Sequence, residues 1–156
     1  MKKAILNIII LMLLTISCKK EVGEQPKSYW TVNGYIYRGF AETHPWGKAF
    51  DADKRMTRYG QSTGDFISIN FDFNYMPGES KIYKVMKYPP GAKQCSITVR
   101  VAGPGSSVNY TSIDSNSELT INVSPGGGLS ASFSNLVLSD YFTGNTIIVS
   151  GYLEEQ

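Results

Sequence analysis

Hydrophobic and polar residues alternate along most of the chain beyond residue 28. In the clearest run Ile67, Ile69 and Phe71 alternate with Ser68 and Asn70. A period of two is that of a β-strand with one buried face. Similar runs predict about eight short strands, the clearest of which span residues 67–73, 97–101, 119–123, 129–138 and 147–153.

Turn residues separate these runs. Asn33-Gly34 is a strong signal for a two-residue hairpin, because a type I′ turn needs positive φ at both positions. Pro or Gly clusters follow the later runs. The apolar pattern shifts by one residue at Asn135, which predicts a β-bulge. The last run ends close to residue 156, so we expect that strand to lie inside the sheet.

The composition supports an all-β fold. From residue 18 onward, Val, Ile, Thr, Phe, Tyr and Trp total 46, whereas Ala and Leu total 11. β-branched and aromatic residues favour strands. No apolar pattern of helical period persists for three turns. We therefore expect residues 29–156 to form a single antiparallel β-sandwich or barrel-like sandwich, with its least regular part at residues 39–64.

The first 17 residues have the layout of a secretory signal peptide. Lys2 and Lys3 precede an apolar run from Ala4 to Ile16, and Ser17 follows it. This run is shorter than the roughly 20 residues that a membrane-spanning helix needs. The pattern predicts export of the chain with removal of residues 1–17.

The residues before Cys18 resemble a bacterial lipobox. Thr15 and Ser17 stand at the positions that usually hold Leu and a small residue. The resemblance implies lipid on the Cys18 sulfur, cleavage after Ser17, and a membrane anchor in which residues 18–28 serve as a flexible tether. The alternative is ordinary secretion with Cys18 as a free thiol. Cys95 then has no disulfide partner, and we expect it to pack as a small apolar side chain.

The net charge of the chain after removal of residues 1–17 bears on its possible partners. Without Lys2 and Lys3, the basic count falls from 15 to 13 and equals the acidic count of 13. A neutral domain gives no electrostatic case for binding nucleic acid or an anionic membrane surface.

The sequence contains no recognisable catalytic motif. His44 is the single histidine, which disfavours a histidine-based zinc site and leaves it most simply as a loop residue. The Asp51–Arg55 segment is most simply a solvated turn, although Asp51 and Asp53 could bind calcium, or pairs of carboxylates could serve a glycosidase. A reactive Cys95–His44 pair is a further alternative. We expect no catalytic residue, metal or cofactor.

Aromatic residues supply the best candidate site. Seven of them fall between Tyr29 and Phe50. Exposed rings beside polar groups bind sugars or anchor protein interfaces. We select as candidate ligand-binding residues Tyr37, Phe40, His44 and Trp46. The competing interpretation places Trp30, Ile36 and Phe40 in the core.

The whole chain resembles the small lipoproteins of Bacteroidota that join a lipobox to a compact β domain. The resemblance rests on Cys18, on Trp30–Gly34 and on the segments 129–133 and 144–151. It implies an outer-membrane location, on the periplasmic or the surface face, and no known reaction. We expect a non-enzymatic module that binds a glycan or small ligand. The alternatives are an assembly subunit that contacts an envelope protein, and a carboxylate-based hydrolase.

Overall fold

The computed structural model describes residues 25–44, 49–53, 64–72, 76–114 and 116–156. These residues form strands, and no helix occurs among them that could span a membrane. The strands are β1 (Ser28–Val32), β2 (Tyr35–His44), β3 (Ala49–Asp53), β4 (Phe66–Phe71), β5 (Lys81–Val85), β6 (Gln94–Gly103), β7 (Ser106–Ser112), β8 (Glu118–Val123), β9 (Leu129–Asp140) and β10 (Thr146–Glu154).

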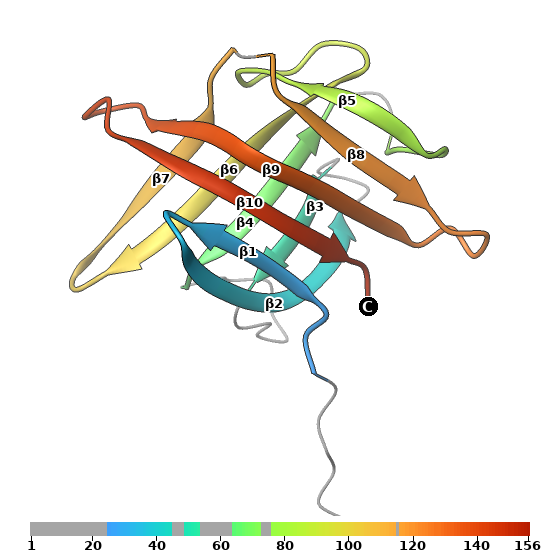
Figure 1. Cartoon of the computed structure of the whole chain (residues 1–156), viewed down its shortest axis with the longest axis horizontal. Helices are drawn as coiled ribbons and strands as arrows, with labels where there is room; N and C mark the ends of the chain where they lie inside the picture. Colours follow the sequence, from blue (N-terminus) through green and yellow to red (C-terminus); the bar gives the residue numbers. More distant parts are fainter. Residues whose placement is uncertain (1–24, 45–48, 54–63, 73–75, 115) are drawn as a thin grey trace, which may run out of the picture.

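The strands close into a barrel (Figure 1). Nine of them form a ring in the order β1-β2-β3-β4-β6-β5-β8-β9-β10, and β10 returns to β1. The tenth, β7, pairs with β6 and β9 and fills the seam between them at one end, while β5 and β8 fill it at the other. The β5–β6 pair is parallel, whereas the other strand pairs are antiparallel. The expected all-β, barrel-like fold is confirmed, with ten strands among the described residues rather than about eight.

The barrel interior is filled by the apolar residues of each alternating run. Trp30 and Phe50 are the largest fully buried side chains, and aliphatic residues of β4, β6, β8 and β10 surround them. Removing such side chains from water is the main stabilising contribution to a fold of this size. Cys95 belongs to this core, as predicted, and burial raises the pKa of its thiol to about 12. It is therefore an unreactive thiol at neutral pH.

The first hairpin is formed by the predicted Asn33-Gly34 turn. Both residues have positive φ, 48° and 88°, and Val32 pairs with Tyr35 across the turn. The turn also contacts β10, since Asn33 accepts a hydrogen bond from the Ile148 N–H and donates its own N–H to the Ile148 carbonyl. This pair of bonds continues the β1–β10 ladder to the tip of the hairpin.

The predicted bulge at Asn135 is confirmed. Its φ is 53°, and the β9–β10 register shifts between Val149 and Gly151. The Asn135 N–H donates to the Ser150 hydroxyl at 2.9 Å, which satisfies a backbone group that the bulge removes from the ladder. The final strand lies between β1 and β9, inside the sheet as expected.

The prediction for residues 39–64 is corrected where the structure describes them. β2 continues through Phe40 to His44, and β3 pairs with both β2 and β4. Asp51 and Asp53 therefore lie on a strand, not in a solvated turn. The alternation of β3 is weak in the sequence because the strand is only five residues long and contributes only Phe50 and Ala52 to the barrel interior.

Candidate functional site

The three predicted ligand-binding residues that the structure describes do not share one face of β2. Tyr37 packs inside the barrel, where its ring stacks on Trp30 with centroids 5.7 Å apart. Strand alternation places Phe40 and His44 on the outer face of β2, opposite to Tyr37. Trp46 lies outside the described residues, as does Cys18. The alternative core assignment is correct for Trp30 but wrong for Ile36, which is 65% exposed.

His44 belongs instead to a charged cluster on the outer face of β2 and β3. Its Nε2 lies 3.1 Å from Glu42 Oε1 and 3.6 Å from Asp51 Oδ2. Glu42 and Asp51 are direct cross-strand partners, which brings two carboxylates to one imidazole. The structure thus places His44 beside Asp51, whereas the sequence analysis considered these two residues as separate candidates.

The electrostatics of this cluster are unfavourable for the aspartate. Burial raises the pKa of Asp51, and Glu42 and Asp53 raise it further, against the opposing effects of Ser68 and His44. Within the described part of the chain, no group of His, Cys, Asp and Glu side chains is arranged to hold a metal ion. We interpret the cluster as a surface contact in which two carboxylates share one imidazole and Asp51 Oδ1 has no hydrogen-bond partner among the described residues.

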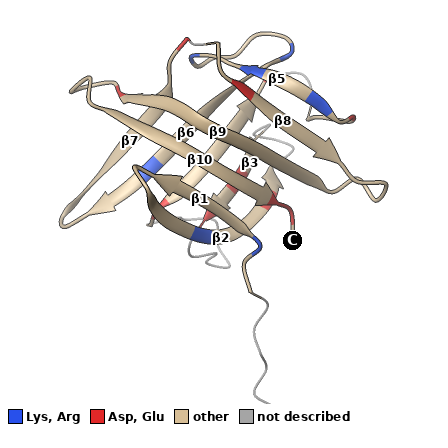
Figure 2. Ribbon diagram, viewed as in Figure 1, with Lys and Arg blue, Asp and Glu red and all other residues tan. Residues whose placement is uncertain are grey.

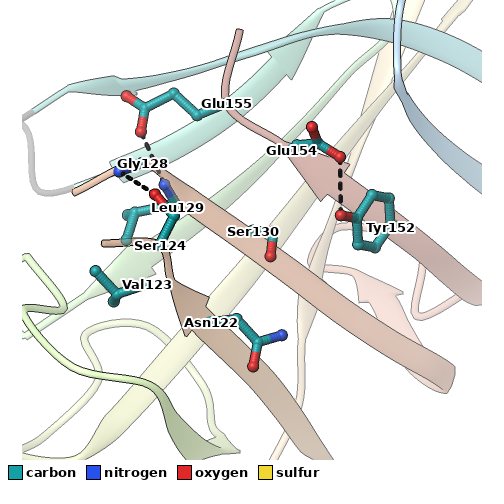
Figure 3. Close-up of a pocket in the computed structure, with 9 residues that line it drawn as sticks. All are labelled: Asn122, Val123, Ser124, Gly128, Leu129, Ser130, Tyr152, Glu154 and Glu155. Carbon is teal, nitrogen blue, oxygen red and sulfur yellow. Dashed lines mark hydrogen bonds between the residues drawn. The ribbon is translucent and has the colours of Figure 1, made fainter. Parts of the chain in front are cut away.

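A better-formed site lies where β8, β9 and β10 meet (Figure 3). It is a pocket of about 360 Å³ that is open to solvent, which is within the range of small-ligand sites. The turn between β8 and β9 and the end of β10 form its walls. Its lining residues are Asn122, Val123, Ser124, Gly128, Leu129, Ser130, Tyr152, Glu154 and Glu155.

Strand register brings the polar groups of this pocket together. Asn122 of β8 pairs with Ser130 of β9, and Ser130 pairs with Glu154 of β10. The three residues form one row across three strands, and alternation directs them away from the core. Tyr152 is two residues before Glu154 and therefore shares this outer face.

The pocket carboxylates are held by hydrogen bonds (Figure 3). Tyr152 Oη donates to Glu154 Oε2, and Lys27 Nζ donates to Glu154 Oε1, both at 2.9 Å. These two donors, Lys27 first, lower the pKa of Glu154, so it is ionised at neutral pH. Glu155 accepts the Leu129 N–H at 2.9 Å and the Thr43 hydroxyl.

An aromatic pair borders the pocket. Tyr29 of β1 and Tyr152 are cross-strand partners whose ring centroids lie 6.4 Å apart. Tyr29 is 42% exposed, so the pair offers ring surface to solvent. Amide, hydroxyl and carboxylate groups beside accessible rings match the hydroxyl groups and the apolar C–H faces of a sugar.

Sequence reasoning missed most of this site. Tyr29 was among the aromatic residues noted, but Tyr152 is 123 positions away along the chain. The one available signal was that Tyr152 stands between Gly151 and Leu153 in an alternating run, which predicts that its ring faces outward.

Comparison with known proteins gives no assignment. No protein-family model, curated protein or solved structure matches this chain.

Proposed function

We propose that this protein is a non-enzymatic binding module that holds a neutral glycan in the pocket between β8, β9 and β10. The observation that carries the proposal is the position of Tyr152 and Tyr29 beside the row formed by Asn122, Ser130 and Glu154. The rings supply surface for stacking, and the row supplies hydrogen-bond donors and acceptors.

The charge of the pocket selects among glycans. Glu154 and Glu155 line it, and Lys27, the cation in contact with the Glu154 carboxylate, is already paired with it. A uronic acid or a phosphorylated sugar would bring a further negative charge against two carboxylates, of which Lys27 balances one. Uncharged sugars avoid this cost, and their hydroxyl groups can donate to the carboxylate oxygens.

The test is isothermal titration of the full chain, purified in detergent, with neutral oligosaccharides and with uronic-acid oligomers of equal length. We expect binding of a neutral oligomer only, and a loss of about tenfold or more in affinity for Tyr152→Ala. The matched control is Tyr141→Ala, which removes an equally large ring from the β9–β10 turn. Neutral-glycan binding that survives Tyr152→Ala, or falls equally in both variants, would contradict the assigned site.

We further propose that Cys18 carries lipid and anchors the domain at the outer membrane. Support comes from the signal-like residues 1–17 and the small residue before Cys18. The first described residues, Gln25 to Lys27, lead directly into β1, so a tether of about ten residues would separate lipid and barrel.

Metabolic labelling with a palmitate analogue tests the anchor. The wild-type chain should take up the label and fractionate with the outer membrane, whereas Cys18→Ser should remain unlabelled and uncleaved. Labelling that persists in Cys18→Ser would place the lipid elsewhere, and an unlabelled wild-type chain would indicate ordinary secretion.

A further inference from the structure

Part of β7 presents an open strand edge. β7 pairs with β6 from Ser106 to Thr111, but with β9 only from Tyr110 to Ser112. Residues 106–109 therefore extend beyond the last β7–β9 pair, Tyr110–Asp140, and no described strand pairs with their second edge. They form, with the end of β6, a two-stranded arm at one side of the barrel (Figure 1).

Hairpin geometry shows which groups occupy this edge. Pro104 and Gly105 form a two-residue turn, so the flanking pair Gly103–Ser106 exchanges hydrogen bonds. Ser106, Val108 and Tyr110 consequently direct their backbone groups toward β6. The intervening residues, Ser107 and Asn109, direct theirs away from it, toward the open side.

The open edge lacks the usual protection. Strand edges are commonly shielded by charged side chains, by proline or by a covering group. The other edge of the same arm is shielded, because the Ala102 N–H donates to the Asp65 carboxylate at 2.8 Å. β5 is an example of a strand that carries charged side chains, namely Lys81 and Lys84. The segment from Ser106 to Asn109 contains neither a charge nor a proline, and all four residues are exposed.

Two aromatic side chains stand next to this edge. Tyr141 and Phe142 follow Asp140 in the β9–β10 turn and are 81% and 91% exposed, with ring centroids 5.5 Å apart. The turn is tightly held. The Asp140 carboxylate accepts the Phe142 N–H, the Thr143 N–H and the Thr143 hydroxyl, and its carbonyl accepts the Gly144 N–H. Rings presented on an ordered turn lose little conformational freedom on binding.

Few charges lie around the edge. Arg100 pairs with Asn109, Asp140 pairs with Tyr110, and the Asp65 carboxylate lies at the opposite edge of the arm. Residues 101–113, which include the whole arm beyond Arg100, contain no Lys, Arg, Asp or Glu, and neither do residues 141–153. Figure 2 shows β9 and β10 uncoloured over nearly their whole length, in contrast to β5. On a two-fold axis every charge meets its own copy, so an uncharged patch is the surface that tolerates self-association.

We propose that two copies of this chain associate through antiparallel pairing of their β7 edges at residues 106–109. An antiparallel edge is complementary to itself, since the N–H and C=O groups of Ser107 and Asn109 meet the same groups of the second copy. The aromatic turns of both copies flank the new pair and bury their rings. The result is a continuous sheet across two barrels.

Site-directed cross-linking in intact cells tests the proposal on the full chain. Asn109→Cys places a thiol at the open edge, and Glu79→Cys places one on the exposed β4–β5 connection as a matched control. With a short bis-maleimide we expect a dimer of twice the chain mass for Asn109→Cys and none for Glu79→Cys.

Edge variants in the Asn109→Cys background make the test specific. Ser107→Pro removes an N–H that faces away from β6, so it blocks pairing while leaving the β6–β7 ladder intact. We expect the cross-linked dimer to fall at least tenfold. Ser107→Lys, which adds a charge on the axis, should act in the same way and decides the matter if Ser107→Pro does not fold. No dimer for Asn109→Cys, equal dimer for Glu79→Cys, cross-linking to a different protein, or a dimer unaffected by Ser107→Lys would each overturn the proposal.

Discussion

The outer face of β2 and β3 differs from the outer face of β9, β10 and β1 in the number of charged side chains that it carries. The first gathers Glu42, His44 and Asp51 within direct contact of one another. The second carries no charged residue between Leu129 and Leu153 except Asp140, which the β9–β10 turn holds by hydrogen bonds. The first, charged face leaves Asp51 Oδ1 buried without a hydrogen-bond partner in the part of the chain that the structure describes. The second, which we call the uncharged face although Glu154 ends it, offers hydroxyl groups, amides and rings to solvent.

The two aspartates show what this difference means. Asp51 is half-buried beside two other carboxylates, and this burial raises its pKa. Asp140 accepts hydrogen bonds from the Thr143 hydroxyl and from backbone N–H groups, which lower its pKa. The same residue type is therefore destabilised as an anion on one face and stabilised as an anion on the other. Recognition is expected where polar groups and aromatic rings are exposed together, which directs attention to the uncharged face.

We expect the largest difference in stability between a substitution in the barrel interior and one in an exposed turn. Phe50→Ala removes a fully buried ring beneath the charged face and should lower the free energy of unfolding by about 3–5 kcal/mol. Phe142→Ala removes an equally large ring that is 91% exposed and should change it by less than about 0.5 kcal/mol. Urea unfolding followed by circular dichroism measures both. Similar losses in the two variants would mean that β3 does not contribute to the core.

A glycine pair probes the packing beneath the uncharged face. A Cβ on Gly151 would stand 2.8 Å from both the Tyr29 carbonyl oxygen and Phe133 Cζ, so Gly151→Ala should cost about 1–3 kcal/mol of stability. At Gly126 the nearest atom would be 3.9 Å away, so Gly126→Ala should be nearly neutral. Thermal melts of both variants provide the comparison. A Gly151→Ala variant as stable as Gly126→Ala would contradict the close approach of β1 to β10.

The charged face should become more stable when Asp51 is neutral. Its folded pKa is raised, so the advantage of the protonated form is present in full below the unfolded value of 3.8 and is lost as pH rises through the folded pKa. Asp51→Asn should therefore unfold at a higher temperature than the wild type near pH 7, by less than about 1 kcal/mol in stability. The difference should vanish near pH 3. A variant that is less stable near pH 7 would show that the attraction to His44 outweighs burial.

The stabilising effect of Asp140 in the β9–β10 turn should depend on pH with the opposite sign. The folded pKa of Asp140 is lowered, so its stabilising effect is present above the unfolded value of 3.8 and is lost as pH falls through the folded pKa. Asp140→Asn should speed amide hydrogen exchange at Phe142 and Thr143 at neutral pH, with little change in the melting temperature of the barrel. Unchanged exchange at both amides would mean that the turn does not depend on the carboxylate.

Local patterns in the sequence predicted much of the fold. Alternation located β4, β6, β8, β9 and β10. Asn33-Gly34 identified a turn through its tolerance of positive φ, and the shift of the apolar pattern at Asn135 identified a bulge. The parallel β5–β6 pair and the closure of the ring depend on which strands become neighbours. That choice is made by packing of the whole barrel, and no short pattern encodes it.

The candidate site was less predictable for the same reason. Asn122, Ser130 and Glu154 become one row only through the β8–β9 and β9–β10 registers. Aromatic density along the chain directed attention to Tyr37 and Phe40, but strand alternation places them on opposite sides of β2. A cluster in sequence is thus divided by the sheet, whereas residues far apart are joined by it.

Pairing of β1 with β10 also determines when the barrel can form during synthesis. Tyr29 leaves the ribosome more than 100 residues before its partner Tyr152. Until Thr146–Glu154 have been made, β1 and β9 both lack a neighbour that the finished ring requires. The nascent chain therefore remains open through most of translation, and the joining of β10 to its two neighbours is a late, long-range event of the kind that slows folding.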